Sequence, residues 1–352
     1  MKRILALIAL TGAHFLAPAI HAQGDYKVLD TTKLFGNGGI DYVYAENDER
    51  RVYVPRGGNT YVFGLDSHQY IGCITNIGGH GIAVDTKSHH GFGSAPKIGM
   101  FDTETMQKIK DIDVQGRPDG ILFEPFSGKV LILSHESPSI TMIDPADGTV
   151  TGTIDVGGAM EQAQSDGQGK LYVDVEDEKK IAVVDMKAMK VLTEYDLGDS
   201  AGEPGGLGLD AQNHILFAMC SNPGVCMVVN ADNGKILDTL PIHSGTDGGG
   251  FNPATMEAWS SQRDGTLTII KENSPTSFAI EQTVTTKAGC KTSSLDTKNN
   301  QIVLICTERM PQATNAPAMT PPPMTPTNGP GGQRRFGGRG GPGNLDVLWV
   351  GR

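Results

Sequence analysis

The apolar residues of this chain fall in short runs rather than in a helical rhythm. Val, Ile, Leu, Tyr and Phe gather in runs of about four to six residues, and Gly, Asp and Asn separate the runs, as in residues 170–198. This pattern is typical of strands joined by tight turns. Beyond the first residues, no window of helical length holds a three-to-four periodicity. The sequence therefore predicts an all-β protein.

The strand pattern also repeats along the chain. In six copies the third strand ends in Asp or a substitute just before a turn, at intervals of 36 to 45 residues: Asp66, Asp102, Asp144, Asp185, Asn230 and Lys271. This period is typical of four-stranded propeller blades. Inner strands are expected to begin near Ile40, Ile82, Gly120, Glu161, Gly206, Gly248 and Thr292. The repeat predicts a seven-bladed β-propeller.

The seventh blade is one strand short at the C-terminal end of the sequence. After the last inner strand, residues 301–306 and 345–350 supply a second and a third strand. Residues 26–34 have the pattern of a further strand at the other end of the chain. An open ring would leave unpaired strand edges, whereas closure removes them. We therefore expect this N-terminal strand to complete the last blade, so that residues 23–352 form a single propeller.

The first 22 residues have a different composition. Lys2 and Arg3 precede an apolar run, and the segment ends among small residues at Ala22. These are the features of a cleaved secretory signal peptide. The alternative, a membrane anchor, requires a longer uninterrupted apolar stretch, and no other run is long enough to be a transmembrane segment. We expect an exported monomer, located in the periplasm or secreted.

A second break in composition covers residues 311–343. Pro, Gly, Thr and Met dominate this segment, which cannot bury enough apolar surface to offset the entropy of ordering it. We expect a disordered loop inserted in the last blade. Arg334, Arg335 and Arg339 make it locally basic, so it is either a solvated linker or a contact to an anionic surface.

The overall charge limits the partners. The formal charge of −11 becomes −13 once Lys2 and Arg3 are removed, and the 29 Lys and Arg residues are dispersed among 40 Asp and Glu. A domain of this charge repels phosphate backbones unless its basic residues are segregated on one face. Nucleic acid is therefore not an expected partner.

Five cysteines in an exported chain indicate disulfides. Cys220 and Cys226 flank a short turn, and Cys290 and Cys306 flank the first hairpin of the last blade. Cross-strand side chains at such positions approach closely enough to bridge, so both pairs are candidate disulfides. The alternative is that they are reduced and buried. Cys73 is left over and is expected to pack inside the first blade, with its redox state open.

Three segments carry a resemblance to a known family. Residues 52–66, 139–157 and 171–198 resemble the YVTN repeat of bacterial YncE-like seven-bladed propellers, which are WD40-like in shape. The likeness extends from Asp41 to Cys306 and resumes at Leu345, although the sixth copy ends in Lys271 and the last is split by the insertion. It implies an exported propeller. Because most members of the family lack an assigned reaction, it indicates location and shape more than chemistry.

The candidate site lies where each inner strand begins, because these points face the central channel of a propeller. The residues there, which we regard as ligand-binding candidates of the funnel, are Asp41, His80, Asp119, Glu161, Glu203, Asp247 and Lys291. Converging carboxylates with one His suit calcium, or a cationic or polyhydroxy ligand. The metal ligands would be Asp119, Glu161, Glu203 and Asp247. The alternative is that these are ordinary turn residues around a wet, polar funnel.

Other chemistries are excluded by missing motifs. The sequence has no Cys-x-x-Cys-His for haem, no Gly-x-Ser-x-Gly elbow and no zinc-type Cys or His spacing. Two hypotheses remain. The first is a non-catalytic propeller that binds an envelope protein or a small ligand. The second is a calcium-dependent enzyme of the lactonase or lyase kind, which is less favoured because lactonase-like propellers combine Asn with acids and no Asn stands at these entries. No catalytic residue is assigned.

Overall fold

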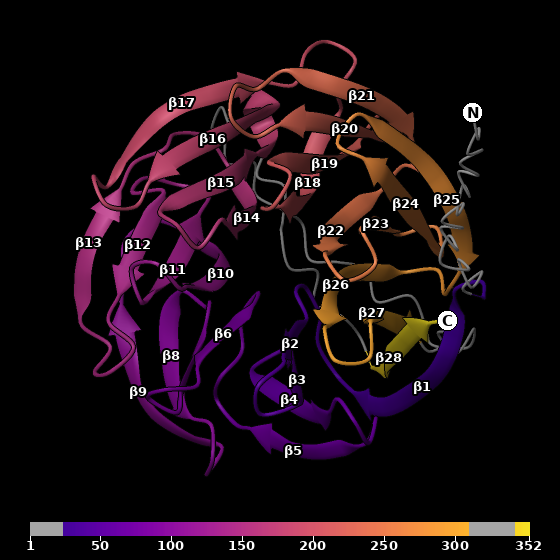
Figure 1. Ribbon diagram of the computed structural model, residues 1–352. Coiled ribbons are helices and arrows are strands. Elements are labelled where there is room, and N and C mark those ends of the chain that lie inside the picture. Colours follow the sequence, from indigo (N-terminus) through magenta and orange to yellow (C-terminus); the bar gives the residue numbers. More distant parts are fainter. Residues whose placement is uncertain (1–23, 310–341) are drawn as a thin grey trace, which may run out of the picture.

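The computed structural model describes residues 24–309 and 342–352. These residues form seven four-stranded antiparallel sheets, arranged as blades around a central channel (Figure 1). The predicted all-β, seven-bladed propeller is confirmed. The predicted signal peptide and nearly all of the predicted loop 311–343 lie outside the described residues. Within the part of the chain that the structure describes, no helix is long and apolar enough to cross a membrane.

Each blade runs from an inner strand at the channel to an outer strand at the rim. The inner strands are β2 (Tyr44–Glu46), β6 (Ile82–Asp85), β10 (Pro118–Glu124), β14 (Met160–Ser165), β18 (Glu203–Asp210), β22 (Thr246–Asn252) and β26 (Cys290–Asp296). The second strands are β3 (Arg51–Arg56), β7 (His90–Gly93), β11 (Lys129–Ser134), β15 (Lys170–Val175), β19 (Ile215–Ser221), β23 (Glu257–Gln262) and β27 (Gln301–Arg309).

The rest of each sheet completes the blade. The third strands are β4 (Asn59–Gly64), β8 (Lys97–Asp102), β12 (Ile140–Ile143), β16 (Lys180–Asp185), β20 (Val225–Asn230), β24 (Thr266–Ser274) and β28 (Gly343–Gly351). The outer strands are β5 (Tyr70–Ile74), β9 (Gln107–Asp113), β13 (Val150–Ile154), β17 (Lys190–Asp196), β21 (Ile236–Pro241), β25 (Ser277–Thr285) and β1 (Lys27–Gly36). A 3-10 turn, η1 (Glu176–Glu178), follows β15.

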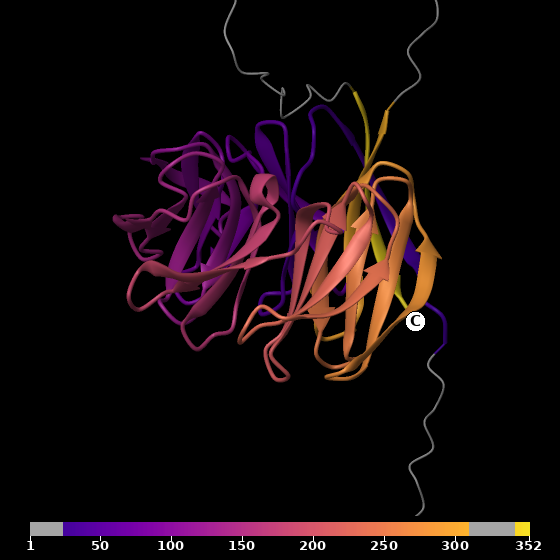
Figure 2. The same ribbon diagram turned by 90° about the horizontal axis from the view of Figure 1, so that it is seen from above.

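The ring closes where β1 joins the last blade. The sheet order is β1-β28-β27-β26, and β1 pairs antiparallel with β28, so that Val28 lies opposite Val350 and Thr32 opposite Val347. Figure 1 shows the indigo β1 beside the yellow β28, and Figure 2, turned by 90°, shows indigo and yellow segments in the same region of the ring. The predicted closure by the N-terminal strand is confirmed.

The first inner strand begins later than predicted. Ile40 makes only an isolated bridge to Arg56, and β2 starts at Tyr44. The reason is that the intervening backbone bonds to the neighbouring blades. The Tyr42 amide donates to the carbonyl of His80 at 3.0 Å, and the Val43 amide donates to the Thr292 hydroxyl at 2.9 Å. This segment therefore ties the first blade to the second and the seventh.

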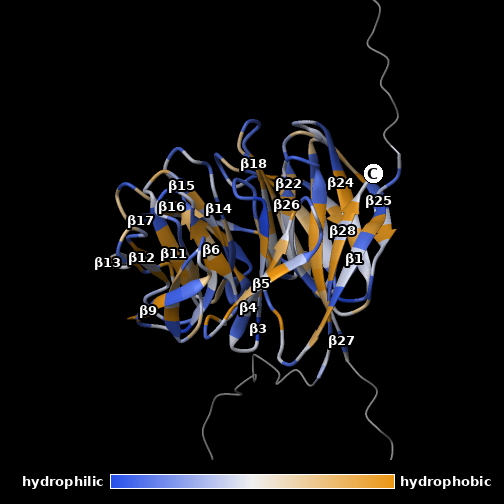
Figure 3. Ribbon diagram, turned by 90° about the horizontal axis from the view of Figure 1, so that it is seen from below, coloured by the Kyte–Doolittle hydropathy of each residue, from blue (hydrophilic) through white to orange (hydrophobic). Residues whose placement is uncertain are grey.

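The apolar core lies between the faces of adjacent blades. Strands alternate their side chains, so each sheet contributes one apolar face to each neighbour. Val54 and Phe63 of the first blade, for example, pack with Trp349 of the last, and all three are fully buried. Figure 3 shows hydrophobic residues within the sheets and hydrophilic residues on many of the loops. Burial of each such side chain contributes about 1.5–3 kcal/mol.

The repeated polar residues serve as turn caps. Carboxylates at the ends of inner strands accept backbone N–H groups of the following turn: Glu46, Asp85, Glu124, Asp210 and Asp296. The third-strand residues Asp102, Asp144, Asp185 and Asn230 do the same. Short polar side chains stabilise turns in this way. The period seen in the sequence is therefore the period of capped hairpins.

The turn cap Asp210 lies close to a buried carboxyl group of the sixth blade, that of Glu272. Glu272 of β24 is 2% exposed, and its Oε1 accepts from Asn213 Nδ2 at 2.8 Å. Burial and the nearby Asp210 raise the pKa of Glu272 to about 7. Because folding raises this pKa, the contribution of Glu272 to stability is fully present at pH values below its pKa in the unfolded chain. The contribution is lost as the pH rises through 7.

We therefore expect Glu272→Gln to remove part of the pH dependence of stability. The variant should be more stable than the parent above pH 7, by up to about 3 kcal/mol, and the difference should shrink toward pH 5. Urea unfolding of the variant and the parent at pH 5 and pH 8 measures the difference in their free energies of unfolding at each pH. Glu178→Gln, a substitution at an exposed carboxylate, is the control. The same pH slope for Glu272→Gln and the parent would contradict the prediction.

The cysteines behave differently from one another. Cys290 and Cys306 lie directly opposite each other in β26 and β27 and are joined in a disulfide, as predicted. The predicted Cys220–Cys226 bridge is wrong, and both thiols are free. In this hairpin Cys220 lies opposite Val225. The one-residue offset turns the two cysteines to opposite faces of the sheet.

The two free thiols of this blade accordingly belong to different cores. Cys220 packs in the cluster between the fourth and fifth blades, and Cys226 in the cluster between the fifth and sixth. Burial raises the pKa of both thiols. Cys73 is a free, half-buried thiol on the outer strand β5 rather than deep inside the blade, and burial raises its pKa too.

Candidate functional site

One end of the channel carries a connected set of charged and polar side chains, which we call the mouth cluster. Its members are Asp41, Tyr42, His80, Asp119, His135, Glu161, Asp247, Arg263 and Lys291. Six of the seven predicted funnel residues are among them. They come together because the entries to the inner strands all face the same end of the ring.

His80 is the centre of one part of the mouth cluster. Its Nδ1 lies 2.6 Å from Asp41 Oδ2 and 3.0 Å from Asp119 Oδ1. The hydrogen bond to Asp41 raises the pKa of His80 above its usual value. Burial alone would raise the pKa of Asp41, but the bond from His80 and the charge of Lys291 bring it below the usual range. The imidazole and its two carboxylates therefore form a compact ionic group.

Two cations hold the other part of the mouth cluster. Lys291 Nζ lies 2.5 Å from Asp41 Oδ1 and 3.2 Å from Asp247 Oδ2. Arg263 Nη2 lies 2.7 Å from Asp247 Oδ1. Burial would lower the pKa of Lys291, but the two aspartates outweigh it and raise that pKa. Asp247 is thus neutralised by cations on both of its oxygens.

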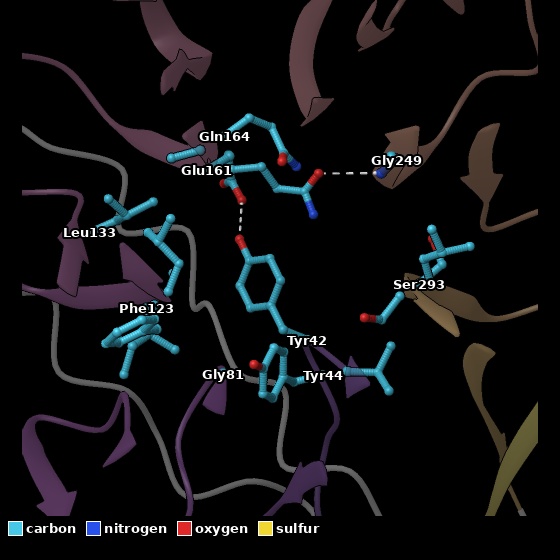
Figure 4. A pocket seen from close by; sticks show the side chains of 18 of the residues that line it. Tyr42, Tyr44, Gly81, Phe123, Leu133, Glu161, Gln164, Gly249 and Ser293 are labelled. Atoms are coloured by element: carbon cyan, nitrogen blue, oxygen red, sulfur yellow. Dashed lines mark hydrogen bonds between the residues drawn. The ribbon is translucent and has the colours of Figure 1, made fainter. Parts of the chain in front are cut away.

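Tyr42 reaches from the first blade to the third and fourth. Its hydroxyl lies 2.8 Å from Glu161 Oε2 (Figure 4). The same hydroxyl lies 3.1 Å from Asp119 Oδ2. Burial, followed by the charge of Asp119, raises the pKa of Glu161 well above the usual value. Burial and the same carboxylates raise the pKa of Tyr42. The tyrosine is therefore a neutral hydrogen-bond donor, and Glu161 retains its proton at higher pH than an ordinary glutamate.

His135 completes this acidic part of the cluster. Its Nε2 lies 3.5 Å from Asp119 Oδ2 and 3.5 Å from Glu161 Oε1. Arg117 Nη2 lies 2.5 Å from Nδ1 of the same ring. A guanidinium group can only donate, so Nδ1 accepts and the ring proton is placed on Nε2. His135 is thus oriented to donate toward the two carboxylates.

Sequence reasoning missed Tyr42, Arg117, His135 and Arg263. His135 and Arg263 follow the second strands β11 and β23. In an antiparallel blade the end of the second strand lies beside the start of the inner strand, so the turns after second strands reach the same mouth. This rule could have identified His135 and Arg263 from the sequence. Tyr42 and Arg117 are close in sequence to Asp41 and Asp119, which were identified.

The predicted calcium ligands are not brought together as one set. Asp119 and Glu161 share Tyr42 and His135, but Asp247 is bound by two cations. Glu203 begins β18 opposite Ser221, and its carboxylate makes no ion pair with any of the described residues. Calcium requires six to eight oxygen ligands. The four predicted residues do not fit that ion.

A cavity of about 420 Å³ lies along the channel and includes Tyr42 and Glu161 in its wall. Polar and aromatic side chains of five blades line it, among them Gln162, Gln164, Ser293, Ser294, Tyr44, Phe123, Phe251 and Trp259. Figure 4 labels Gln164, Ser293, Tyr44 and Phe123 of this set. Gln162 Oε1 accepts from the Leu207 amide at 2.9 Å, and Gln164 Nε2 donates to the Leu207 carbonyl at 2.9 Å. These glutamines lie over β18, which contributes no lining residue.

Comparison with known proteins identifies the class of fold. No family model matches this chain, and no curated protein matches it in sequence. A chain in the crystal structure of the mitotic checkpoint complex superposes with a TM-score of 0.68 and 13% identity, over 86% of this chain and 95% of that chain. The structure of U3-55K superposes with a TM-score of 0.69 and 8% identity, over 92% and 99%.

Identities this low show the fold alone. The protein is a seven-bladed β-propeller, structurally like WD40 proteins. This fold is commonly a binding or scaffold module, and it does not by itself indicate a reaction. The ligand has to be argued from the mouth cluster and the cavity.

Proposed function

We propose that this protein is an exported, YncE-like binding module that takes a small polyhydroxy ligand in its central channel. The observation that carries the proposal is the cavity, because its wall combines amide and hydroxyl groups with aromatic rings. Export is supported by the composition of residues 1–22, and the YncE-like assignment by the YVTN-type repeats.

The charges of the mouth cluster favour a neutral ligand. Asp41 and Asp247 are paired with Lys291, Arg263 and His80. Recognition within the cavity therefore falls to uncharged groups, which are Gln162, Gln164, Ser293 and Ser294. Aromatic faces cover the apolar C–H surface of a sugar ring, and amides and hydroxyls bond its oxygens. A mono- or disaccharide has this chemistry.

A small ligand is also favoured over a protein partner by location. The groups that could recognise a ligand come from five blades and line the channel, as Figure 4 shows for Tyr42, Glu161 and Gln164. Groups gathered in a channel are accessible to a small molecule or a narrow chain. A folded partner would contact the rim instead. The proposal therefore places binding in the channel.

Trp259 allows a direct test, because it lines the cavity and its Nε1 donates to Ser293 Oγ at 2.9 Å. With Trp349→Phe as background, we expect a saturable change in Trp259 emission on titration with glucose, maltose, trehalose or inositol. Ser294→Phe, which fills the cavity, should weaken this binding at least ten-fold. Ser277→Phe on the outer strand β25 is the matched control and should not.

Circular dichroism of each variant checks that the propeller is folded. The proposal is supported if at least one of these compounds binds the background protein and loses affinity in Ser294→Phe alone. It is wrong if none of them changes the emission at concentrations up to the solubility limit. It is also wrong if Ser294→Phe and Ser277→Phe bind with equal affinity.

A further inference from the structure

We propose that the mouth holds one divalent first-row transition-metal ion, such as Zn²⁺, between Asp41, His80 and Asp119. These three come from the entries of the first, second and third blades. The inference goes beyond ligand binding in the cavity and does not depend on it, because Asp41, His80 and Asp119 are not part of the cavity wall.

The positions of the ligand atoms carry the proposal. Asp41 Oδ2, His80 Nδ1 and Asp119 Oδ1 converge, with Nδ1 at 2.6 Å and 3.0 Å from the two oxygens. Each atom of this group lies within 4.8 Å of the others. Zinc bonds of about 2.0–2.2 Å separate the ligand atoms of a tetrahedral site by roughly 3.4 Å. A small movement of these side chains would therefore admit an ion among them.

The outer oxygens of both carboxylates are already held. Asp41 Oδ1 accepts from Lys291, while Asp119 Oδ2 faces the Tyr42 hydroxyl at 3.1 Å and His135 Nε2 at 3.5 Å. Each carboxylate is thereby oriented with its other oxygen toward His80. Metal sites use hydrogen bonds of this kind to fix their ligating carboxylates.

A second group, formed by Asp119, His135 and Glu161, is also compact but is less suitable. Arg117 donates to Nδ1 of His135, which places the ring proton on the nitrogen that faces the carboxylates. In both rings the nitrogen that faces the carboxylates carries a proton, because a carboxylate only accepts, and a metal must displace that proton. At His80 the proton can move to Nε2, whereas at His135 it would have to move to Nδ1, where it would face the Arg117 donor. The structure therefore favours the first group as the metal site and gives His135 an orienting role.

The donor set also selects the class of metal. One imidazole nitrogen and two carboxylates suit zinc, manganese, iron or cobalt, whereas calcium prefers oxygen ligands only. The side chains of Asp41 and His80 are about a quarter exposed, at 26% and 29%. Solvent can therefore occupy the remaining coordination positions. The ion would have an open side toward the outside of the channel.

Metal titration of the chelator-treated protein tests the proposal. We expect one Zn²⁺ per chain in competition with a chromophoric chelator, and Ca²⁺ weaker by at least 100-fold. Co²⁺ should give a visible ligand-field band that reports nitrogen coordination. His80→Gln and Asp119→Asn should each weaken Zn²⁺ at least 100-fold and remove the band. His243→Gln is the matched control, since His243 forms a similar pair with Asp264 at 2.7 Å on the surface.

Several outcomes would overturn the site. Absence of stoichiometric Zn²⁺ binding by the parent protein is one, and unchanged binding in a folded His80→Gln variant is another. If His80→Gln does not fold, as judged by circular dichroism, Asp41→Asn provides the same comparison. Loss of the Co²⁺ band in His135→Gln with its retention in His80→Gln would place the ion in the second group. Failure of saccharide binding would leave these results unaffected, so the two proposals can fail separately.

Discussion

A chain that begins at residue 37, and so lacks β1, is expected to lose cooperative folding. This strand pairs with β28 along its whole length and closes the sheet of the last blade. It also connects both neighbours of that blade. The Tyr26 hydroxyl, just before β1, lies 2.6 Å from Glu257 Oε2 of the sixth blade. The buried Arg56 of the first blade donates to the carbonyls of Leu34 and Gly36.

Removal of β1 would therefore leave unpaired groups on β28 and take away the two hydrogen bonds that the buried Arg56 donates to Leu34 and Gly36. Small proteins are stable by only about 5–15 kcal/mol in total, and the loss of a strand with its buried contacts is of comparable size. Urea unfolding followed by circular dichroism is the measurement. A chain that begins at Asp25 is the control and should unfold cooperatively. Addition of a peptide of residues 24–37 should restore a transition to the shortened chain, and a shortened chain with full stability would contradict the prediction.

The fold was predictable because its signals are local and repeated. Asp102, Asp144 and Asp185 cap equivalent turns. Each turn needs an acceptor for its backbone N–H groups, and the same residue type therefore recurs at each position. Seven repeats with one strand missing left only one way to avoid an open edge. The structure confirms this closure in the pairing of β1 with β28. Neither inference required knowledge of any contact between distant side chains.

The site was predictable only in part. The rule that inner-strand entries face the channel found Asp41, His80 and Asp119, and it placed Glu203 there as well. It could not show which entries would touch. Which side chains touch depends on their length and on how closely the blades are spaced. Tyr42 and His135 were missed because they lie in segments that the rule did not cover.

The register of paired strands is a second feature that could not be predicted from the sequence. Cys290 and Cys306 lie opposite each other, whereas Cys220 and Cys226 are offset by one residue. Both pairs flank a hairpin in the sequence. A shift of one position turns a side chain to the other face of its strand. Turn length alone did not fix this register, so one prediction was right and the other wrong.

The blades are packed most closely where β18 meets β22, and glycine makes this possible. A Cβ atom at Gly206 would lie 2.7 Å from the Gly248 carbonyl carbon, and one at Gly208 would lie 2.8 Å from the Gly250 oxygen. These neighbours are backbone atoms, which cannot rotate away. The two inner strands would have to separate. This close approach accounts for the absence of β18 from the cavity wall, since its neighbours and the glutamines of β14 cover it.

Gly206→Ala and Gly208→Ala are therefore each expected to destabilise the protein by about 1–3 kcal/mol, the usual cost of overpacking, and the double variant by more. Gly205→Ala is the matched control on the same strand, because its Cβ would meet only the Thr246 oxygen at 3.4 Å. Urea midpoints for the four variants give the comparison. Equal midpoints for Gly205→Ala and Gly208→Ala would show that the strands are not in close contact. If the strands do separate, Leu207 moves away from Gln162 and Gln164, so saccharide titration of Gly208→Ala would also report how far the shape of the cavity depends on this contact.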